Sequence, residues 1–221
     1  CKMLYLILKD ILIQKKIFIF GIFYILILIL SFQGIGNIMF SSSIIAFAYI
    51  LVQSACAYDD KSKSDIMLNS LPISRNTIVT ARYVSTFIFA AIAVAYYVIL
   101  TNIIKILGLP LKVYPITLEE IVAALFAITL LSGIYFPVFF KFGYIKSRVV
   151  NIVLFFGLFF GLGILLPQMI KNMDKEFAES IIRSFINQPD ILIAVEILAV
   201  MIGLLVISYI LSLKFYKERE F

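Results

Sequence analysis

The chain alternates long uncharged stretches with short charged segments. Charged residues are absent from positions 17–58, 83–104, 121–140, 149–170 and 197–213. A charged side chain at the centre of a lipid bilayer costs about 2.5 to 3.5 kcal/mol, and a helix needs about 20 apolar residues to cross one. The pattern therefore predicts an all-α, polytopic membrane protein whose charged segments lie where the chain meets water. Its composition agrees, because 63% of the 221 residues are hydrophobic and 14% are charged.

The first uncharged stretch is too long for one span. Residues 33–37 interrupt it with the sequence Gln-Gly-Ile-Gly-Asn, which is typical of a turn. This predicts a helical hairpin within residues 17–58. We expect a single transmembrane domain over residues 1–221, with six spans at about 17–33, 40–57, 83–105, 119–140, 149–170 and 191–213.

Six spans place both termini on one side of the membrane, and the basic residues indicate which side. Lys and Arg number four before the first span, four in the 58–82 loop, three in the 141–148 loop and three after the last span. These fourteen face five on the other side. Cytoplasmic segments carry the excess of Lys and Arg, so both termini are expected in the cytoplasm. Because these residues flank spans and form no single patch, the net charge of +6 does not indicate a nucleic-acid partner.

Two segments outside the spans are amphipathic. Near the N-terminus, Asp10 lies off an apolar stripe that consists of Leu4, Ile7, Leu8 and Ile11. The stripe predicts a helix over 2–16 that lies along the inner surface of the membrane. On the outer side, apolar positions recur among charged residues before Pro189: Phe177, Ile181, Ile182, Phe185 and Ile186. They predict an outer interfacial or re-entrant helix at about 174–188.

The 58–82 loop is the most organised segment between the spans. Ser64 can cap a short helix over 65–71, with Asp65 in its first turn and Pro72 stopping it. Ser74 can cap a second helix that continues into the third span. The short helix presents apolar side chains outside the membrane, at Ile66, Met67 and Leu71. They are expected to contact either a partner protein or the ends of the chain's own spans.

A few residues within the predicted spans can do more than face lipid. Glu196 is expected either to line or pair along a pathway, or to extend its carboxylate to the outer interface. Gly157, Gly161 and Gly163 provide a small-residue surface for close helix contact, within one protomer or across a dimer.

Several kinds of chemistry are excluded by the residues that the chain lacks. It contains no histidine, which excludes a Ser-His relay and histidine metal ligation, and we expect no metal site. No glycine is followed by lysine, so the chain has no phosphate loop and is not expected to hydrolyse nucleotides itself. The Glu119-Glu120 pair is similar to that of CAAX-type intramembrane proteases, but Ala124 stands where their pattern has arginine. The pair is therefore interpreted as acids at a helix N-terminus.

The organised loop also carries a resemblance to a known family. It contains Leu71-Pro72-Ile73-Ser74-Arg75, followed by Ile78-Val79 and Arg82-Tyr83. This resembles the stretch SLPISR..IV..KY of type 2 ABC exporter permeases, with Arg82 where lysine is common. The layout of the whole chain is similar as well. Small members without large outer domains include bacterial exporters of peptides such as phenol-soluble modulins, and permeases for antimicrobial-peptide resistance or lantibiotic immunity.

The resemblance implies a dimer of permeases, identical or related, on a dimer of separate ABC ATPase subunits in the bacterial cell membrane. ATP and magnesium would bind the ATPase, so this chain would need no cofactor and would be no enzyme. The substrates would be amphipathic or hydrophobic peptides, with Phe177, Ile181 and Phe185 at an outer gate. The coupling element that docks on the ATPase would comprise Asp65, Ile66, Met67, Leu68, Asn69, Ser70, Leu71, Pro72, Ser74 and Arg75.

Two other functions remain open from the sequence. A secondary carrier should show inverted repeats and charged or broken helices at mid-membrane, yet no convincing repeat is present and Glu196 is the lone acid inside a predicted span. A membrane adaptor or immunity protein without an ATPase needs no transport path. It would leave the ordered 58–82 loop without a role.

Overall fold

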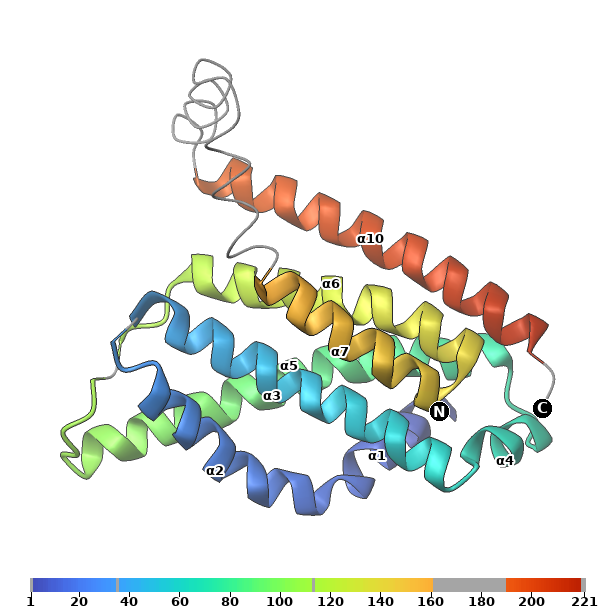
Figure 1. The fold of residues 1–221 in the computed structure, drawn as a ribbon, viewed down its shortest axis with the longest axis horizontal. Coiled ribbons are helices and arrows are strands. Elements are labelled where there is room, and N and C mark those ends of the chain that lie inside the picture. The colour runs from blue at the N-terminus through green and yellow to red at the C-terminus, as the bar shows by residue number, and fades with distance from the viewer. Residues whose placement is uncertain (1, 35, 113, 161–189, 220–221) are drawn as a thin grey trace.

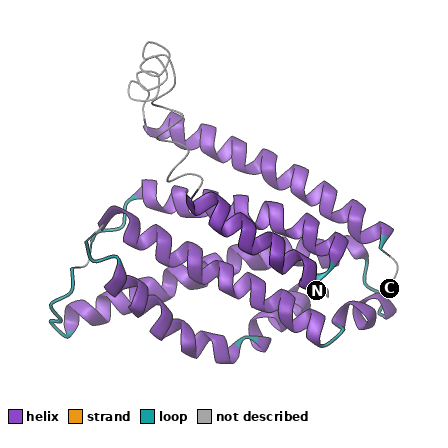
Figure 2. Ribbon diagram, viewed as in Figure 1, coloured by secondary structure: helices purple, strands orange, loops and turns teal. Residues whose placement is uncertain are grey.

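The regular structure of the chain is helical throughout the part that the computed structural model describes, residues 2–34, 36–112, 114–160 and 190–219 (Figures 1 and 2). The helices are α1 (Lys2–Ile13), α2 (Lys15–Ser31), α3 (Gly36–Lys61), α4 (Ser64–Ser70), α5 (Arg75–Ile106), α6 (Leu118–Phe142), α7 (Tyr144–Phe160) and α10 (Asp190–Glu218). The all-α prediction is confirmed for these residues. The predicted break in the first uncharged stretch is also confirmed, because α2 ends at Ser31 and α3 begins at Gly36, inside the predicted turn.

Four helices, α3, α5, α6 and α10, are each long and apolar enough to cross a membrane. Helices α1 and α2 meet this condition only as a pair, and they are bent by 60° at their junction. The described part of α7 ends at Phe160, inside the predicted fifth span. Length and composition therefore support four or five crossings in the described residues, and six crossings remain a prediction.

The ends of the bundle are occupied by different segments. The start of α1, the short helix α4 and the end of α10 lie at one end, which we call the α4 end (Figure 1). The turns from α2 to α3 and from α5 to α6 lie at the opposite end (Figure 1). This arrangement suits an even number of crossings, with both termini on the side of α4.

The N-terminal helix departs from its predicted orientation. Leu6 and Ile7 are buried, but so is Asp10, which was expected to face water. Leu4 and Leu8 are exposed instead, beside Tyr5 and Leu12. The reason is electrostatic, because Asp10 has a cationic partner inside the bundle. The exposed apolar side chains still form the face that a helix on the membrane surface would turn toward lipid.

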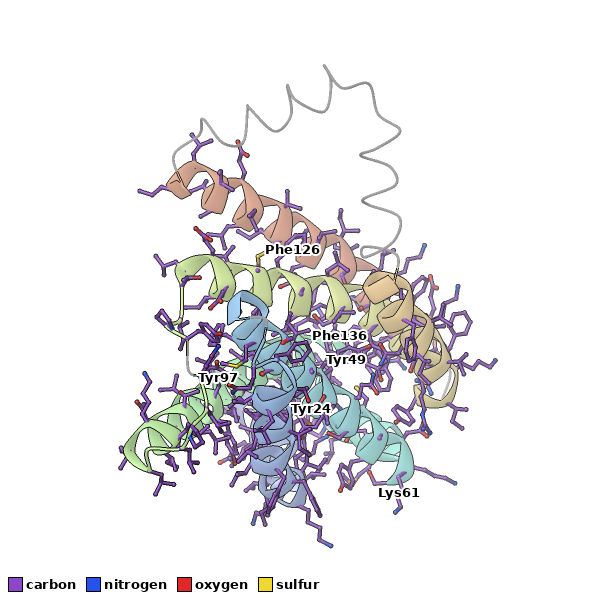
Figure 3. The ribbon with its side chains drawn as sticks, turned by 60° about the vertical axis from the view of Figure 1, so that its left-hand side comes forward. Tyr24, Tyr49, Lys61, Tyr97, Phe126 and Phe136 are labelled. Atoms are coloured by element: carbon purple, nitrogen blue, oxygen red, sulfur yellow. The ribbon has the colours of Figure 1, made fainter. Side chains whose placement is uncertain are left out.

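Aromatic side chains fill the interior between the helices. Tyr49, Tyr97 and Phe136 are buried, and Lys61 lies at the end of α3 (Figure 3). The ring centroids of Phe40 and Tyr97 lie 5.1 Å apart in an edge-to-face arrangement, which aromatic pairs favour.

A glycine permits close contact between α2 and α3. A Cβ atom at Gly21 would overlap the ring of Phe47, a fully buried side chain of α3. Gly157, which the sequence singled out for helix packing, has open space where its Cβ would lie. Gly157 therefore makes no close helix contact with the described residues. The close contact is made by Gly21, which the sequence did not predict.

These two glycines should respond oppositely to alanine. Gly21→Ala should destabilise the protein by about 1 to 3 kcal/mol, the usual cost of overfilling a packed interior. Gly157→Ala, the matched control, should be neutral or stabilising, because alanine favours helix by about 1 kcal/mol over glycine. Thermal unfolding in detergent measures both. Equal unfolding temperatures for the two variants would contradict the packing of α2 on α3.

Candidate functional site

The short helix α4 connects α3 to α5 and ends as predicted. Leu71 is extended, with φ −85° and ψ 154°, as expected for a residue before proline, so Pro72 stops the helix. The start differs from the prediction. Lys63 is the N-cap, in a left-handed conformation, and the Ser64 hydroxyl donates to the carbonyl of Asp59 at 3.3 Å instead of capping α4. Ser74 does cap α5, because its hydroxyl accepts a hydrogen bond from the backbone N–H of Thr77.

Among the described side chains of α4 and the residue after it, one apolar side chain is buried and two are exposed. Leu68 is buried against the core, whereas Met67 is 58% exposed and Leu71 is 44% exposed. Ser70 and Pro72 are exposed beside them. We call Met67, Ser70, Leu71 and Pro72 the α4 surface. The side chains of Asp65, Ile66 and Asn69 lie outside the described structure.

Two basic residues hold the segment after α4 in place. Lys2 donates from its Nζ atom to the carbonyl oxygen of Pro72 at 2.6 Å. Arg75 donates from one guanidinium nitrogen to the carbonyl oxygens of Lys217 at 2.6 Å and Tyr216 at 3.2 Å. A cation at the last turn of α10 is favourable, since the carbonyl groups there lack helical partners. Arg75, expected within the coupling element, therefore also joins α5 to α10.

Close to the start of α4 lies a group of four charged side chains, Lys9, Asp10, Asp59 and Arg82, which we call the charge cluster. Lys9 is partly exposed and the other three are buried. Arg82 donates to the Oδ2 atom of Asp10 at 2.9 Å and also contacts Asp59. Lys9 donates to Asp59 at 2.8 Å and lies 3.4 Å from Asp10. The cluster thus joins α1, α3 and α5, and its two positive and two negative charges balance.

Burial makes this pairing necessary. The exposed fractions of Asp10, Asp59 and Arg82 are 4%, 2% and 8%. An ion removed from water is tolerated only where opposite charges and hydrogen bonds replace its hydration. Asp10 gains one more donor, because the Ser85 hydroxyl binds its Oδ2 atom at 3.1 Å. The sequence did not predict this cluster. Its only signals were an acid beside an apolar stripe and an arginine where the family has lysine.

The other side of α5 carries a group of hydroxyls that joins it to α10 and α6. Tyr83 lies within hydrogen-bonding distance of Ser208 and, at 2.9 Å, of Ser212. Ser208 donates to the carbonyl oxygen of Gly133. Since each hydroxyl has one proton, Tyr83 must donate to Ser208 and accept from Ser212. The first turns of α5 are therefore joined to α1 and α3 by ion pairs and to α10 by hydrogen bonds.

The remaining predicted residues are not brought together. Glu196 is exposed on α10. Glu119 and Glu120 begin α6 as interpreted from the sequence, and Glu120 forms a capping box with Thr117. The other predicted packing and gate residues lie outside the described residues: Gly161, Gly163, Phe177, Ile181 and Phe185.

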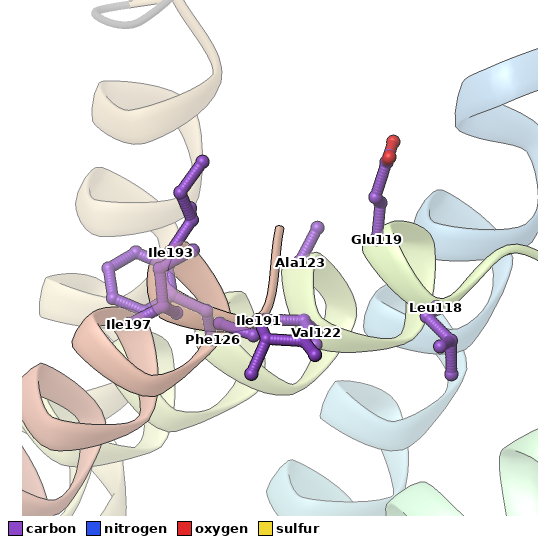
Figure 4. A pocket seen from close by; sticks show the side chains of 9 residues that line it. Leu118, Glu119, Val122, Ala123, Phe126, Ile191, Ile193 and Ile197 are labelled. Carbon is purple, nitrogen blue, oxygen red and sulfur yellow. The ribbon is translucent and has the colours of Figure 1, made fainter. Parts of the chain in front are cut away.

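A cavity of about 500 Å³ lies between the first turns of α6 and α10, at the end opposite α4. Eight of the nine side chains that line it are apolar: Leu118, Val122, Ala123, Phe126, Ile191, Ile193, Ala194 and Ile197. Phe126 and Ile197 lie together at one end of the cavity, and Glu119 lies at the other (Figure 4). Such walls accept an apolar surface without imposing a fixed geometry.

Comparison with known proteins decides the family. The model of the ABC-2 family transporter proteins matches residues 5–217 of the chain. The chain belongs to the ABC-2 family. It is therefore a multi-pass membrane protein and the non-catalytic membrane subunit of an ABC exporter, and the family implies an ABC ATPase as its partner. No curated protein and no solved structure matches the chain.

The stability of this ABC-2 subunit should depend on the balance of charge in the cluster. Arg82→Met leaves the cluster with one excess buried negative charge, so it should destabilise the protein by about 3 to 5 kcal/mol. Replacing its partner as well, in Asp10→Leu with Arg82→Met, should recover most of that loss, because the remaining Lys9 and Asp59 pair is neutral. Thermal unfolding in detergent measures both variants. A double variant no more stable than the single one would contradict the pairing.

Proposed function

We propose that this ABC-2 subunit exports amphipathic or hydrophobic peptides from the bacterial cytoplasm, and that its ATPase docks on the α4 surface. The observation that carries the docking proposal is a short helix with Met67 and Leu71 exposed at the end of the bundle where both termini lie (Figure 1). Outside a membrane, exposed apolar side chains on a fixed helix are typical of a protein interface. The proposal places the α4 end in the cytoplasm, as the basic residues predict.

The position of α4 suits the transmission of movement. It lies between α3 and α5, two of the helices that can cross the membrane. Lys2 fixes the carbonyl of Pro72, and Arg75 fixes the start of α5 to α10. A displacement of α4 by the ATPase would therefore move the ends of several helices together. With a second permease, the same or a related chain, this movement would change the access to a shared path.

The peptide proposal is supported by the apolar character of the described interior. The buried charges at the α4 end neutralise one another, so they offer no free site for an ionic solute. The cavity between α6 and α10 provides an apolar wall for one face of an amphipathic peptide. Exposed apolar side chains on α7, such as Val149 and Val153, leave a face for lipid or a second permease.

Charge on the α4 surface should release the ATPase. Met67→Asp with Leu71→Asp should abolish copurification of the partner, because two carboxylates would have to be desolvated in an apolar contact. Membrane insertion should persist, since both side chains are already exposed. Leu109→Asp, an equally exposed leucine at the opposite end of the bundle, is the matched control. Wild-type binding of the ATPase by the double variant would refute the docking site.

The substrate can be tested in proteoliposomes that contain the subunit and its ATPase. Amphipathic helical peptides should stimulate ATP hydrolysis and accumulate across the bilayer. Phe126→Ala should reduce export several-fold, since truncating a buried aromatic contact costs about 1 to 2 kcal/mol or more. Phe142→Ala, at the other end of the same helix, should leave export unchanged. Stimulation by sugars or inorganic ions, with no response to peptides, would exclude the peptide proposal but not the exporter.

A further inference from the structure

The charge cluster ties the N-terminal helix to both neighbours of α4. Asp59 lies five positions before α4 begins, on α3, and Arg82 lies near the start of α5. Lys9 and Asp10 bind them from α1. Helix α4 itself is one hydrogen bond away, because Ser64 donates to the carbonyl of Asp59. One path from α4 into the bundle, through Ser64 and Asp59, therefore passes beside this cluster.

We propose that the charge cluster is the joint through which movement of α4 reaches α1 and α2. The proposal rests on the function proposed above, in which the ATPase moves α4. In this role Arg82 is a positioning residue, since it contacts neither substrate nor ATPase. It holds the carboxylates of Asp10 on α1 and Asp59 on α3 at the same time.

Three polar contacts distributed along α1 make it part of the same unit. Lys2 binds the carbonyl of Pro72 at the start, Asp10 binds Arg82 in the last turn, and Gln14 donates to the carbonyl of Leu51 at 3.0 Å just after the end. Immediately after Gln14 in the chain, α2 begins at an angle of 60° to α1. If α1 moves with α4, the bend converts that movement into a tilt of α2.

The ionic character of the joint explains why it would be rigid. Apolar surfaces slide past one another with little change in free energy, because each position buries a similar area. Separating Arg82 from Asp10 would instead leave two unpaired charges in a medium where they are poorly solvated. The cluster therefore favours one arrangement of α1, α3 and α5.

The double variant Asp10→Leu with Arg82→Met tests the joint. It removes the bond from α1 to α5 and keeps the buried group neutral, so the protein should fold and bind its ATPase as the wild type does. Peptide-stimulated ATP hydrolysis and export should fall about tenfold or more, within the usual range of coupling between sites. Thr101→Val is the matched control, because the Thr101 hydroxyl binds only carbonyls of its own helix. Wild-type export by a double variant that binds ATPase would overturn the proposal.

A distance measurement tests the same proposal without disturbing the cluster. Spin labels would replace the exposed residues Tyr5 on α1 and Asn76 on α5, after removal of the native cysteines. The distance between the labels should be equal in the ADP state and with a non-hydrolysable ATP analogue. A change between the two states would show that α1 moves independently, and would refute the joint. Because this result does not depend on where the ATPase docks, the joint and the α4 surface can fail separately.

Discussion

The structure of the α4 end depends on the pairing of a buried guanidinium group with two carboxylates. Arg82 is 8% exposed, so its charge cannot be hydrated by bulk water and must be matched inside the bundle. The matching groups come from two other helices, Asp10 on α1 and Asp59 on α3. The orientation of α1 follows from this match, because turning Asp10 inward turns Leu4 and Leu8 outward. The same pairing fixes the two helices that flank α4.

Helix α5 is the centre of this arrangement. It contributes Arg82 to the charge cluster and Ser85, which donates a hydrogen bond to Asp10. Its Tyr83 forms hydrogen bonds with serines of α10. Arg75 adds a bond to the end of α10. At the opposite end, α6 and α10 line a cavity whose walls are mostly apolar. The helices are thus joined by ion pairs and hydrogen bonds at the end where the ATPase is proposed to act. The cavity at the opposite end, where a peptide is proposed to leave, has mostly apolar walls.

Two glycines of the chain have different surroundings. Gly21 lets α2 approach α3 until its backbone meets the ring of Phe47, which fills the interior of one protomer. A Cβ at Gly157 would meet none of the described residues, and the helix carries other side chains, such as Val153 and Phe156, that are exposed and apolar. In a lipid bilayer such a face has no hydrophobic reason to avoid lipid, so close packing at small residues decides whether it binds a second chain.

The sequence by itself determined the helical class, the turn before α3, the stop at Pro72 and the cap at Ser74. Each follows from local chemistry. Uncharged stretches as long as a bilayer is thick form helices, and the proline ring cannot continue a helix. The Ser74 hydroxyl accepts a hydrogen bond from the backbone N–H three residues later. Tertiary structure alone decided the charge cluster, since Asp10 and Arg82 are 72 positions apart and no local spacing predicts their contact. It also placed Gly21 of α2 against the ring of Phe47 on α3. These outcomes depend on which faces of distant helices meet, and only the folded bundle sets that.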